Sequence, residues 1–124
     1  MNYKTTQAHE DLRARVRAFA EAEVKPIAFK LDQENCFPRD AVTKMGELGL
    51  MGLPYGTEYE GAGLDVLSYA IAVEELSRVD GGTGVILSAH TSLGTYPMSH
   101  SAMRNRKRNI FRIFAPAGRS VPSA

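Results

Sequence analysis

Apolar side chains recur at helical spacing through most of the first hundred residues. Thr6 can cap a first helix, whose apolar stripe comprises Leu12, Val16, Phe19 and Val24. Pro26 lacks an amide hydrogen, so it predicts a break or restart before a second helical piece over residues 27–32. A third helix is expected to start near Pro38 and stop at Gly49, with an inward stripe of Val42, Met45 and Leu48.

Two further helices are predicted after a glycine-rich loop over residues 52–63. Asp65 can cap the first of them, whose inward residues are predicted to be Leu67, Ala70, Ile71, Val73 and Leu76. Its solvated side is predicted to hold Glu74, Glu75 and Arg78. Residues 84–98 are apolar nearly all round, which indicates a buried central helix that Pro97 kinks or ends. No segment alternates apolar and polar residues at period two, so the sequence predicts an all-α fold.

Charge divides the chain at its C-terminal end. The 124 residues suit at most one domain, with 44% hydrophobic and 23% charged residues. Residues 101–124 carry six of the fifteen basic residues and none of the fourteen acidic ones. The first hundred residues therefore have a net charge of −5 and the tail one of +6, an asymmetry that requires an explanation.

The cysteine content and the apolar stretches of the sequence predict the cellular compartment of the protein. A single cysteine, Cys36, cannot form an internal disulfide and suits a reducing compartment. The N-terminal residues have no apolar stretch of signal-peptide type. The weakly polar stretch over residues 81–98 falls short of the roughly 20 apolar residues of a membrane span. We therefore expect a cytoplasmic protein that does not contact a membrane.

Residue types that carry catalysis or bind metals do not assemble into a recognisable site. The three histidines, His9, His90 and His100, lack metal-ligand spacing, and His90 is interpreted as a hydrogen-bonded core residue. Cys36 is interpreted as a buried structural thiol. The glycines at 61 and 63 do not complete a dinucleotide fingerprint, and no predicted strand precedes them. From the residues alone, we expect a small helical domain without catalytic or metal-binding residues.

Five short sequence segments, in this order, resemble the N-terminal helical domain of the acyl-CoA dehydrogenases, most closely the butyryl-type, short-chain members. They are VRAFAEAEVKPIA (16–28), LGLMGLP (48–54), YEGAGLD (59–65), YAIAVEELSRVD (69–80) and SAHTSLGTYP (88–97). The resemblance implies α,β-dehydrogenation of a short-chain acyl-CoA thioester by an FAD-dependent homo-oligomer that passes electrons to electron-transfer flavoprotein. It also implies that the catalytic glutamate and most of the flavin site belong to parts of the family's enzymes that this chain lacks, so the chain alone is expected to be inactive.

The resemblance further implies that the last helix contributes one wall of the acyl pocket. The matching positions are Val85, Ile86, Ala89 and Leu93, which lie along one helix face. Ordinary core packing is the alternative interpretation. It is favoured for Leu93, and both interpretations stay open for the other three residues.

The family resemblance ends at His100, so the sequence predicts a helical domain over residues 1–100 and a disordered or poorly packed basic tail over residues 101–124. If one thymine is restored after the His100 codon, permitted codons for the tail can encode the family's Glu-Gln-Lys and Lys-Tyr-Leu-Pro words in order. This favours a frameshift origin for the tail. The alternative is a non-enzymatic interaction module with a basic arm for nucleic acid or acidic membranes, whose charge suits phosphate contacts. We expect neither partner under the frameshift interpretation.

Overall fold

The computed structural model describes residues 4–57 and 61–101, and within them the chain is helical with no strand. The α-helices are α1 (Gln7–Phe19), α2 (Lys25–Glu34), α3 (Arg39–Glu47), α4 (Val66–Val79), α5 (Gly81–Ala89) and α6 (Tyr96–Ser101). Two π-helical segments, η1 (Ala20–Val24) and η4 (His90–Thr95), and a 3₁₀ turn, η2 (Leu50–Gly52), connect some of them. The all-α prediction is confirmed. The predicted tail lies outside the described residues from residue 102 onward.

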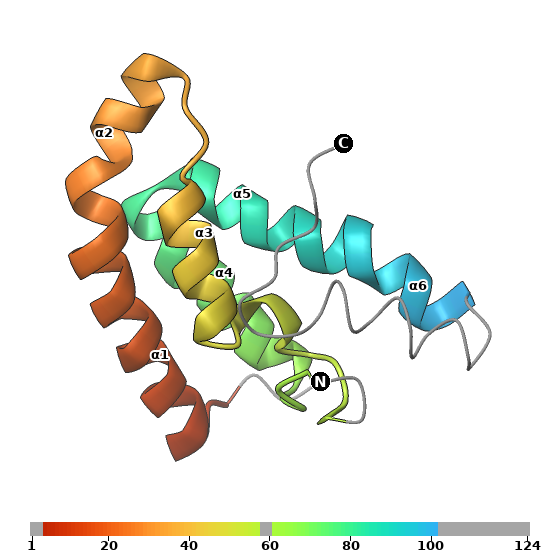
Figure 1. Ribbon diagram of the computed structural model, residues 1–124. Helices are drawn as coiled ribbons and strands as arrows, with labels where there is room; N and C mark the ends of the chain where they lie inside the picture. Colours follow the sequence, from red (N-terminus) through yellow and green to blue (C-terminus); the bar gives the residue numbers. More distant parts are fainter. Residues whose placement is uncertain (1–3, 58–60, 102–124) are drawn as a thin grey trace.

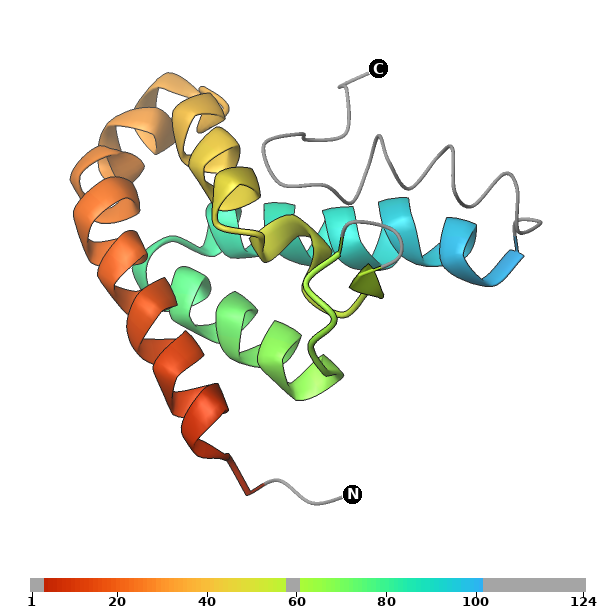
Figure 2. The same ribbon diagram turned by 60° about the horizontal axis from the view of Figure 1, so that its bottom comes forward.

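Two long rods dominate the arrangement (Figures 1 and 2). The first runs from α1 through η1 into α2, and the second from α5 through η4 into α6. In each rod a proline, Pro26 or Pro97, lies in the first turn of the helix that follows the π-helical segment. A proline inside an α-helix removes a hydrogen bond and its ring clashes with the carbonyl four residues earlier. The wider π turn accommodates both effects, so each rod continues where the sequence predicted a break or restart at Pro26 and a kink or end at Pro97.

The core forms where α4 packs against both rods and α3 covers them. Helix α4 contacts α1 on one side and α5 on the other. The buried cluster comprises Leu12, Val16, Phe19, Ala20, Val24, Ala41, Val42, Met45, Leu50, Met51, Leu53, Ala72, Leu76 and Leu87. The predicted stripe of α1 is confirmed in full. Two predicted inward residues are wrong, because Leu48 follows the last turn of α3 and is 54% exposed, and Ala70 lies on the exposed side of α4.

Both predicted N-caps are present and are joined by a histidine. Thr6 caps α1 in a capping box whose third residue is His9, and Asp65 caps α4 by accepting from the Ser68 amide at 2.8 Å. The His9 Nδ1 atom accepts from the Thr6 amide at 3.0 Å, so its Nε2–H donates to the Asp65 carboxylate at 2.9 Å. The hydrogen bonds from Ser68, followed by that from His9, lower the pKa of Asp65 to about 2. The starts of α1 and α4 are thereby fixed to each other.

The predicted solvated position of Glu75 is wrong. Its side chain is buried between α1 and α4, where it accepts from Arg17 at 2.9 Å through two nitrogens and from Arg13 at 2.8 Å. Arg78 completes the group at 3.4 Å. The hydrogen bonds from Arg17, and then those from Arg13, outweigh burial and lower the pKa of Glu75 to about 2. The burial of this carboxylate follows from the three guanidinium groups that surround it, which the periodicity of α4 alone does not reveal.

The link between α2 and α3 corrects the interpretation of Cys36. Asn35 ends α2 in the left-handed conformation, and Cys36 follows it on the surface. The thiol donates to the Glu34 carbonyl oxygen at 3.5 Å and is exposed rather than buried. Because the left-handed residue turns the chain away from the α2 axis, the thiol leaves the apolar side of that helix.

Candidate substrate-binding face

The predicted pocket residues lie on the second rod, whose start is fixed by a cap. Asp80 ends α4 and caps α5, and its Oδ2 atom accepts from the Thr83 amide at 3.0 Å and from the Thr83 hydroxyl at 2.6 Å. The one-residue link at Asp80 turns the chain back, so that α5 packs against α4 near the link (Figure 2). One side of α5 is therefore buried against α4.

The inner side of this rod is a stripe of residues spaced four apart. Thr83, Leu87, Thr91 and Thr95 are all buried, at 3% exposure or less. In a regular α-helix, residues four apart drift round the axis by about 40° per step, so four such residues would not stay on one face. The π-helical segment η4 widens the turn after Ala89, which reduces this drift and keeps the stripe facing inward.

The wider turn of η4 also keeps the outward-pointing residues of α5 and η4 on one side of the rod. Val85 is 65% exposed and Leu93 is 76% exposed, while Ile86 and Ala89 are half-buried between them. The prediction that residues 84–98 form a buried central helix is wrong for its outer side, because Val85 and Leu93 are mostly exposed, whereas Ile86 packs partly against the core. Core packing, the interpretation favoured for Leu93, is also wrong. We call the side formed by Val85, Ile86, Ala89 and Leu93 the outward face.

Two tyrosines hold the rod against the remainder of the fold. The Tyr69 hydroxyl donates to the Ser88 carbonyl oxygen at 3.1 Å, and the Tyr55 hydroxyl donates to the Thr91 carbonyl oxygen at 2.5 Å. Burial, followed by the proximity of Tyr69 and Tyr96, raises the pKa of Tyr55 to about 12. Sequence reasoning did not identify these contacts, because Tyr55 lies in a loop that shows no helical periodicity.

The interior of η4 contains one polar atom without a partner. Thr91 is 3% exposed, and its Oγ1 atom has no hydrogen-bond partner among the described residues. Thr95 donates its hydroxyl to the His90 carbonyl oxygen at 3.0 Å, which satisfies a backbone group that the wide turn would leave open. His90 itself is buried, as expected for a core residue.

The outward face suits an apolar ligand and supplies no chemistry of its own. Its four side chains are aliphatic and carry no titratable group, and the described residues contain no group of histidines, cysteines or carboxylates that could hold a metal. The diphosphate of FAD would require cations or a glycine-rich turn at a strand end. The face provides neither, so it does not fit the diphosphate of FAD. No described helix is long and apolar enough to cross a membrane.

The family model for the acyl-CoA dehydrogenase N-terminal domain matches residues 6–115. The match extends past His100, so the predicted boundary there stays a prediction. The short-chain-specific acyl-CoA dehydrogenase of Clostridium acetobutylicum is 60% identical over 93 residues, which cover 75% of this chain and 24% of that relative. The mitochondrial short-chain-specific acyl-CoA dehydrogenase of mouse is 50% identical over 108 residues, which cover 87% of this chain and 26% of that relative. The chain thus spans about a quarter of the length of the curated relatives it matches.

Solved structures agree with this assignment. A chain from a structure of the electron transferring flavoprotein of Acidaminococcus fermentans matches with a TM-score of 0.90 and 35% identity, covering 100% of this chain and 34% of that chain. Butyryl-CoA dehydrogenase from Megasphaera elsdenii matches with a TM-score of 0.87 and 27% identity, covering 94% of this chain and 31% of the other. An acyl-CoA dehydrogenase from Bacillus anthracis complexed with FAD gives a TM-score of 0.83 and 29% identity, covering 92% and 19% of the two chains.

Proposed function

The chain belongs to the acyl-CoA dehydrogenase family, and from this premise we propose that its outward face forms one wall of the acyl pocket in a short-chain acyl-CoA dehydrogenase. The observation that carries the proposal is the exposure of Val85 and Leu93 on a helix whose opposite side is fully buried. An aliphatic wall held rigid by backbone hydrogen bonds fits an acyl chain, which offers only methylene and methyl groups. The names of the relatives support a short chain.

The wall acts by binding, orienting and excluding water. Its aliphatic groups contribute roughly 25 cal/mol for each Å² of apolar surface that the acyl chain removes from water. The tyrosine contacts at Ser88 and Thr91 fix the height of the helix and hence the position of the thioester relative to the remaining catalytic groups. The α-proton base is expected outside this chain, so the described residues position the substrate and do not transfer its protons.

The cofactor and the redox partner follow from the same premise. FAD, the cofactor proposed for the complete enzyme, would be bound by parts of the enzyme beyond the described residues. The related structure complexed with FAD supports this choice. Electron-transfer flavoprotein is the proposed electron acceptor, supported by the likeness to a chain in the Acidaminococcus structure. A homo-oligomeric complete enzyme and a cytoplasmic location stay predictions, and the mouse relative is named as mitochondrial.

A chimera tests the proposed function. Residues 6–100 of this chain would replace the matching segment of the Clostridium acetobutylicum relative, and dye reduction by butyryl-CoA would be measured with the FAD content. The proposal expects the chimera to retain flavin and to oxidise butyryl-CoA, while the isolated chain with added FAD reduces no dye. A chimera that folds and binds flavin but fails to oxidise any short acyl-CoA would contradict the proposal, as would activity of the isolated chain.

A second candidate function uses the same exposed side chains without catalysis. Val85 and Leu93 are 65% and 76% exposed, and apolar patches of this kind promote association with other proteins. Under this alternative the chain is a free-standing helical interaction module. Size-exclusion chromatography distinguishes the two, because an unpartnered docking face predicts aggregation or association, and a clean monomer over a wide concentration range argues against it.

The frameshift origin of the basic tail stays a proposal that DNA can test. Charge balance and the family words both change at Ser101. The nucleotides after the His100 codon are expected to encode Lys-Tyr-Leu-Pro in an alternative frame, opposite Arg108 to Arg112. Stop codons at the beginning of that frame would overturn the account.

A further inference from the structure

The last residue of the outward face, Leu93, lies inside the wide turn η4, whereas the other three residues precede that turn on α5. In a regular α-helix, Leu93 would lie about 80° round the axis from Val85, since each step of four residues adds about 40°. Both side chains are strongly exposed in the structure, at 76% and 65%. The shape of η4 therefore decides whether Leu93 belongs to the same face as the residues on α5.

A proline explains why the rod contains a wide turn, but not where that turn lies. In a regular helix the ring of Pro97 would clash with the carbonyl group of Leu93, four residues earlier. A wide turn at more than one position before the proline would relieve that clash. In the turn that the structure has, the Tyr96 amide donates to the Thr91 carbonyl oxygen, five residues earlier. A further contact is needed to select this turn.

That contact comes from the loop before α4. The Tyr55 hydroxyl donates to the same Thr91 carbonyl oxygen at 2.5 Å, so this oxygen accepts from two donors, one for each of its lone pairs. Tyr55 is 8% exposed. Because the pKa of Tyr55 is raised to about 12, its hydroxyl stays protonated, and hence a donor, at neutral pH.

The loop fixes Tyr55 through its own backbone. The Tyr55 amide donates to the Gly52 carbonyl oxygen at 3.2 Å, and the Tyr55 carbonyl oxygen accepts from the Gly63 amide at 2.8 Å. A Cβ atom at Gly61 would lie 2.4 Å from the Tyr55 carbonyl oxygen, so the two sides of the loop pack more closely than another residue there would allow. The position of Tyr55 is thus set by its loop rather than by the rod.

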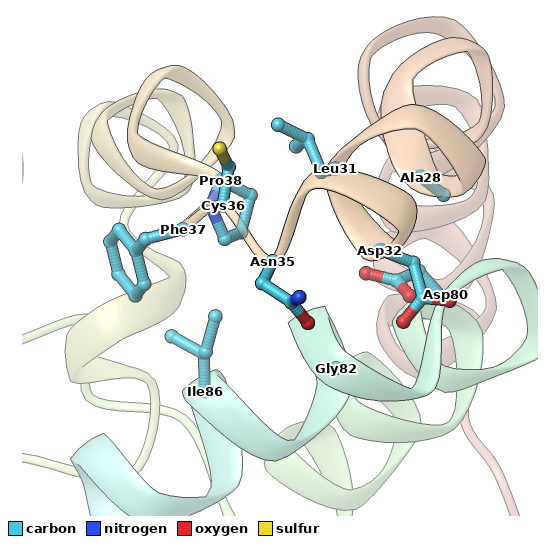
Figure 3. A pocket seen from close by; sticks show the side chains of 10 residues that line it. All are labelled: Ala28, Leu31, Asp32, Asn35, Cys36, Phe37, Pro38, Asp80, Gly82 and Ile86. Atoms are coloured by element: carbon cyan, nitrogen blue, oxygen red, sulfur yellow. The ribbon is translucent and has the colours of Figure 1, made fainter.

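The start of the outward face has a different support. Asp80 caps α5 there, and Ile86 borders a cavity of about 390 Å³ that Leu31 and Phe37 also line (Figure 3). Tyr55 does not belong to the lining of this cavity. A change at the Tyr55 hydroxyl should therefore reach Leu93 and leave Ile86 in place.

We propose that Tyr55 is a positioning residue for the acyl pocket, because its hydroxyl fixes where the wide turn lies and thereby holds Leu93 on the outward face. This rests on the proposed function, since Leu93 affects substrate selection only if the outward face lines the acyl pocket. Tyr55 acts through Thr91 and Leu93 and does not touch the substrate itself. The direction of Leu93 changes the space left for the acyl chain, and hence the preference between short and long chains.

Amide hydrogen exchange of the full chain tests the effect on the turn without any substrate. Tyr55→Phe removes the hydroxyl and keeps the ring, and it is expected to speed exchange of the Tyr96 amide, the donor of the wide turn, at least about fivefold. The Leu87 amide, in the buried part of α5, should keep its parental rate. Equal acceleration at both amides would indicate general destabilisation and would overturn the proposal, as would an unchanged rate at Tyr96.

Substrate selectivity tests the effect on the pocket, in the chimera that carries residues 6–100 of this chain. The ratio of kcat/KM for butyryl-CoA to that for octanoyl-CoA would be measured for Tyr55→Phe, Leu93→Ala and the double variant. Each single substitution is expected to change the ratio at least about threefold. The double variant should match Leu93→Ala within about twofold, because Tyr55 acts through Leu93.

Tyr69→Phe is the matched control, because it removes the same hydroxyl from a backbone carbonyl oxygen at Ser88, before the wide turn. Its effect on the ratio should multiply with that of Leu93→Ala, as expected of independent sites. A Tyr55→Phe effect that also multiplies, or a ratio that Tyr55→Phe leaves unchanged, would overturn the proposal. Failure of the proposed function is distinguishable, because the unsubstituted chimera would then oxidise no short acyl-CoA, while the exchange rates would still decide whether Tyr55 fixes the turn.

Discussion

Two regions of the molecule differ in how their side chains are accommodated: the contact between α1 and α4, and the outward face of α5 and η4. Between α1 and α4, a carboxylate that is 1% exposed is surrounded by three arginines, and His9 joins the caps of both helices. On the outward face, the aliphatic side chains of Val85 and Leu93 are 65% and 76% exposed. The buried polar groups between α1 and α4 therefore find their hydrogen-bond partners within the chain. The outward face, in contrast, leaves apolar side chains exposed.

The difference indicates which parts of the fold the chain can stabilise alone. A buried carboxylate without its cations would cost several kcal/mol, so α1 and α4 must dock correctly for the domain to fold. Exposed leucine and valine side chains contribute little to folding of the isolated domain and gain stability only when covered. We infer that the first region specifies the fold and that the second is shaped by what binds to it.

The largest expected effect compares the two sides of the second rod. Leu87→Ala removes a side chain with 0% exposure from the core and is expected to cost about 2–5 kcal/mol of unfolding free energy. Leu93→Ala, on the outward face, is expected to change it by less than about 0.5 kcal/mol. Urea denaturation followed by circular dichroism measures both. Similar losses for the two variants would break the comparison.

The next effect concerns the buried carboxylate between α1 and α4. Glu75→Ala leaves three guanidinium groups without their shared partner, and we expect a loss of about 2–3 kcal/mol. The value lies below that of a fully buried pair, because the Arg17 and Arg78 side chains are 54% and 46% exposed and can turn to water. Glu74→Ala is the matched control, since that neighbour is 67% exposed and should lose less than about 0.5 kcal/mol. Equal losses would show that burial of Glu75 contributes nothing specific.

A smaller, pH-dependent effect tests the joined caps. The pKa of Asp65 is lowered to about 2, so its contribution to stability is complete above the unfolded pKa of about 4 and is lost as the pH falls toward 2. Asp65→Asn should cost about 0.5–1 kcal/mol at pH 7, a small value because the side chain is 58% exposed. When urea midpoints are repeated, the difference between variant and parent should be unchanged at pH 5 and should shrink at pH 3.5 and further at pH 2.5. A difference that is independent of pH would mean that the charge of Asp65 plays no part.

The sequence predicted the elements that depend on local spacing and caps. The stripe of α1, the caps Thr6 and Asp65, the helix stop at Gly49 and the absence of strands in the described residues are all confirmed. Each of these features depends on residues within one or two helical turns of each other, so the spacing of residues along the sequence is enough to predict it.

The errors arose where distant residues decide the outcome. Glu75 is buried because Arg13 and Arg17, about sixty positions earlier, meet it across the fold. Residues 84–98 are apolar all round, and hydropathy cannot tell a core helix from one whose outer side awaits a ligand or another domain. The π turns before Pro26 and Pro97 were also missed, because proline in a helical pattern usually signals an end. For the outward face, the residues came from family resemblance, and only their exposure is now established.

The most direct test of the central claim uses the chimeric enzyme and two valines. Val85 on the outward face and Val66 at the start of α4 are 65% and 71% exposed, so the same substitution to serine perturbs the isolated fold equally little. If the outward face lines the acyl pocket, Val85→Ser should lower kcat/KM for butyryl-CoA at least about fivefold, because it places a hydroxyl against the acyl chain. Val66→Ser should leave kcat/KM within twofold, roughly the scatter expected of a neutral surface change. Equal kcat/KM values for the two variants would contradict the assignment of the outward face to the substrate.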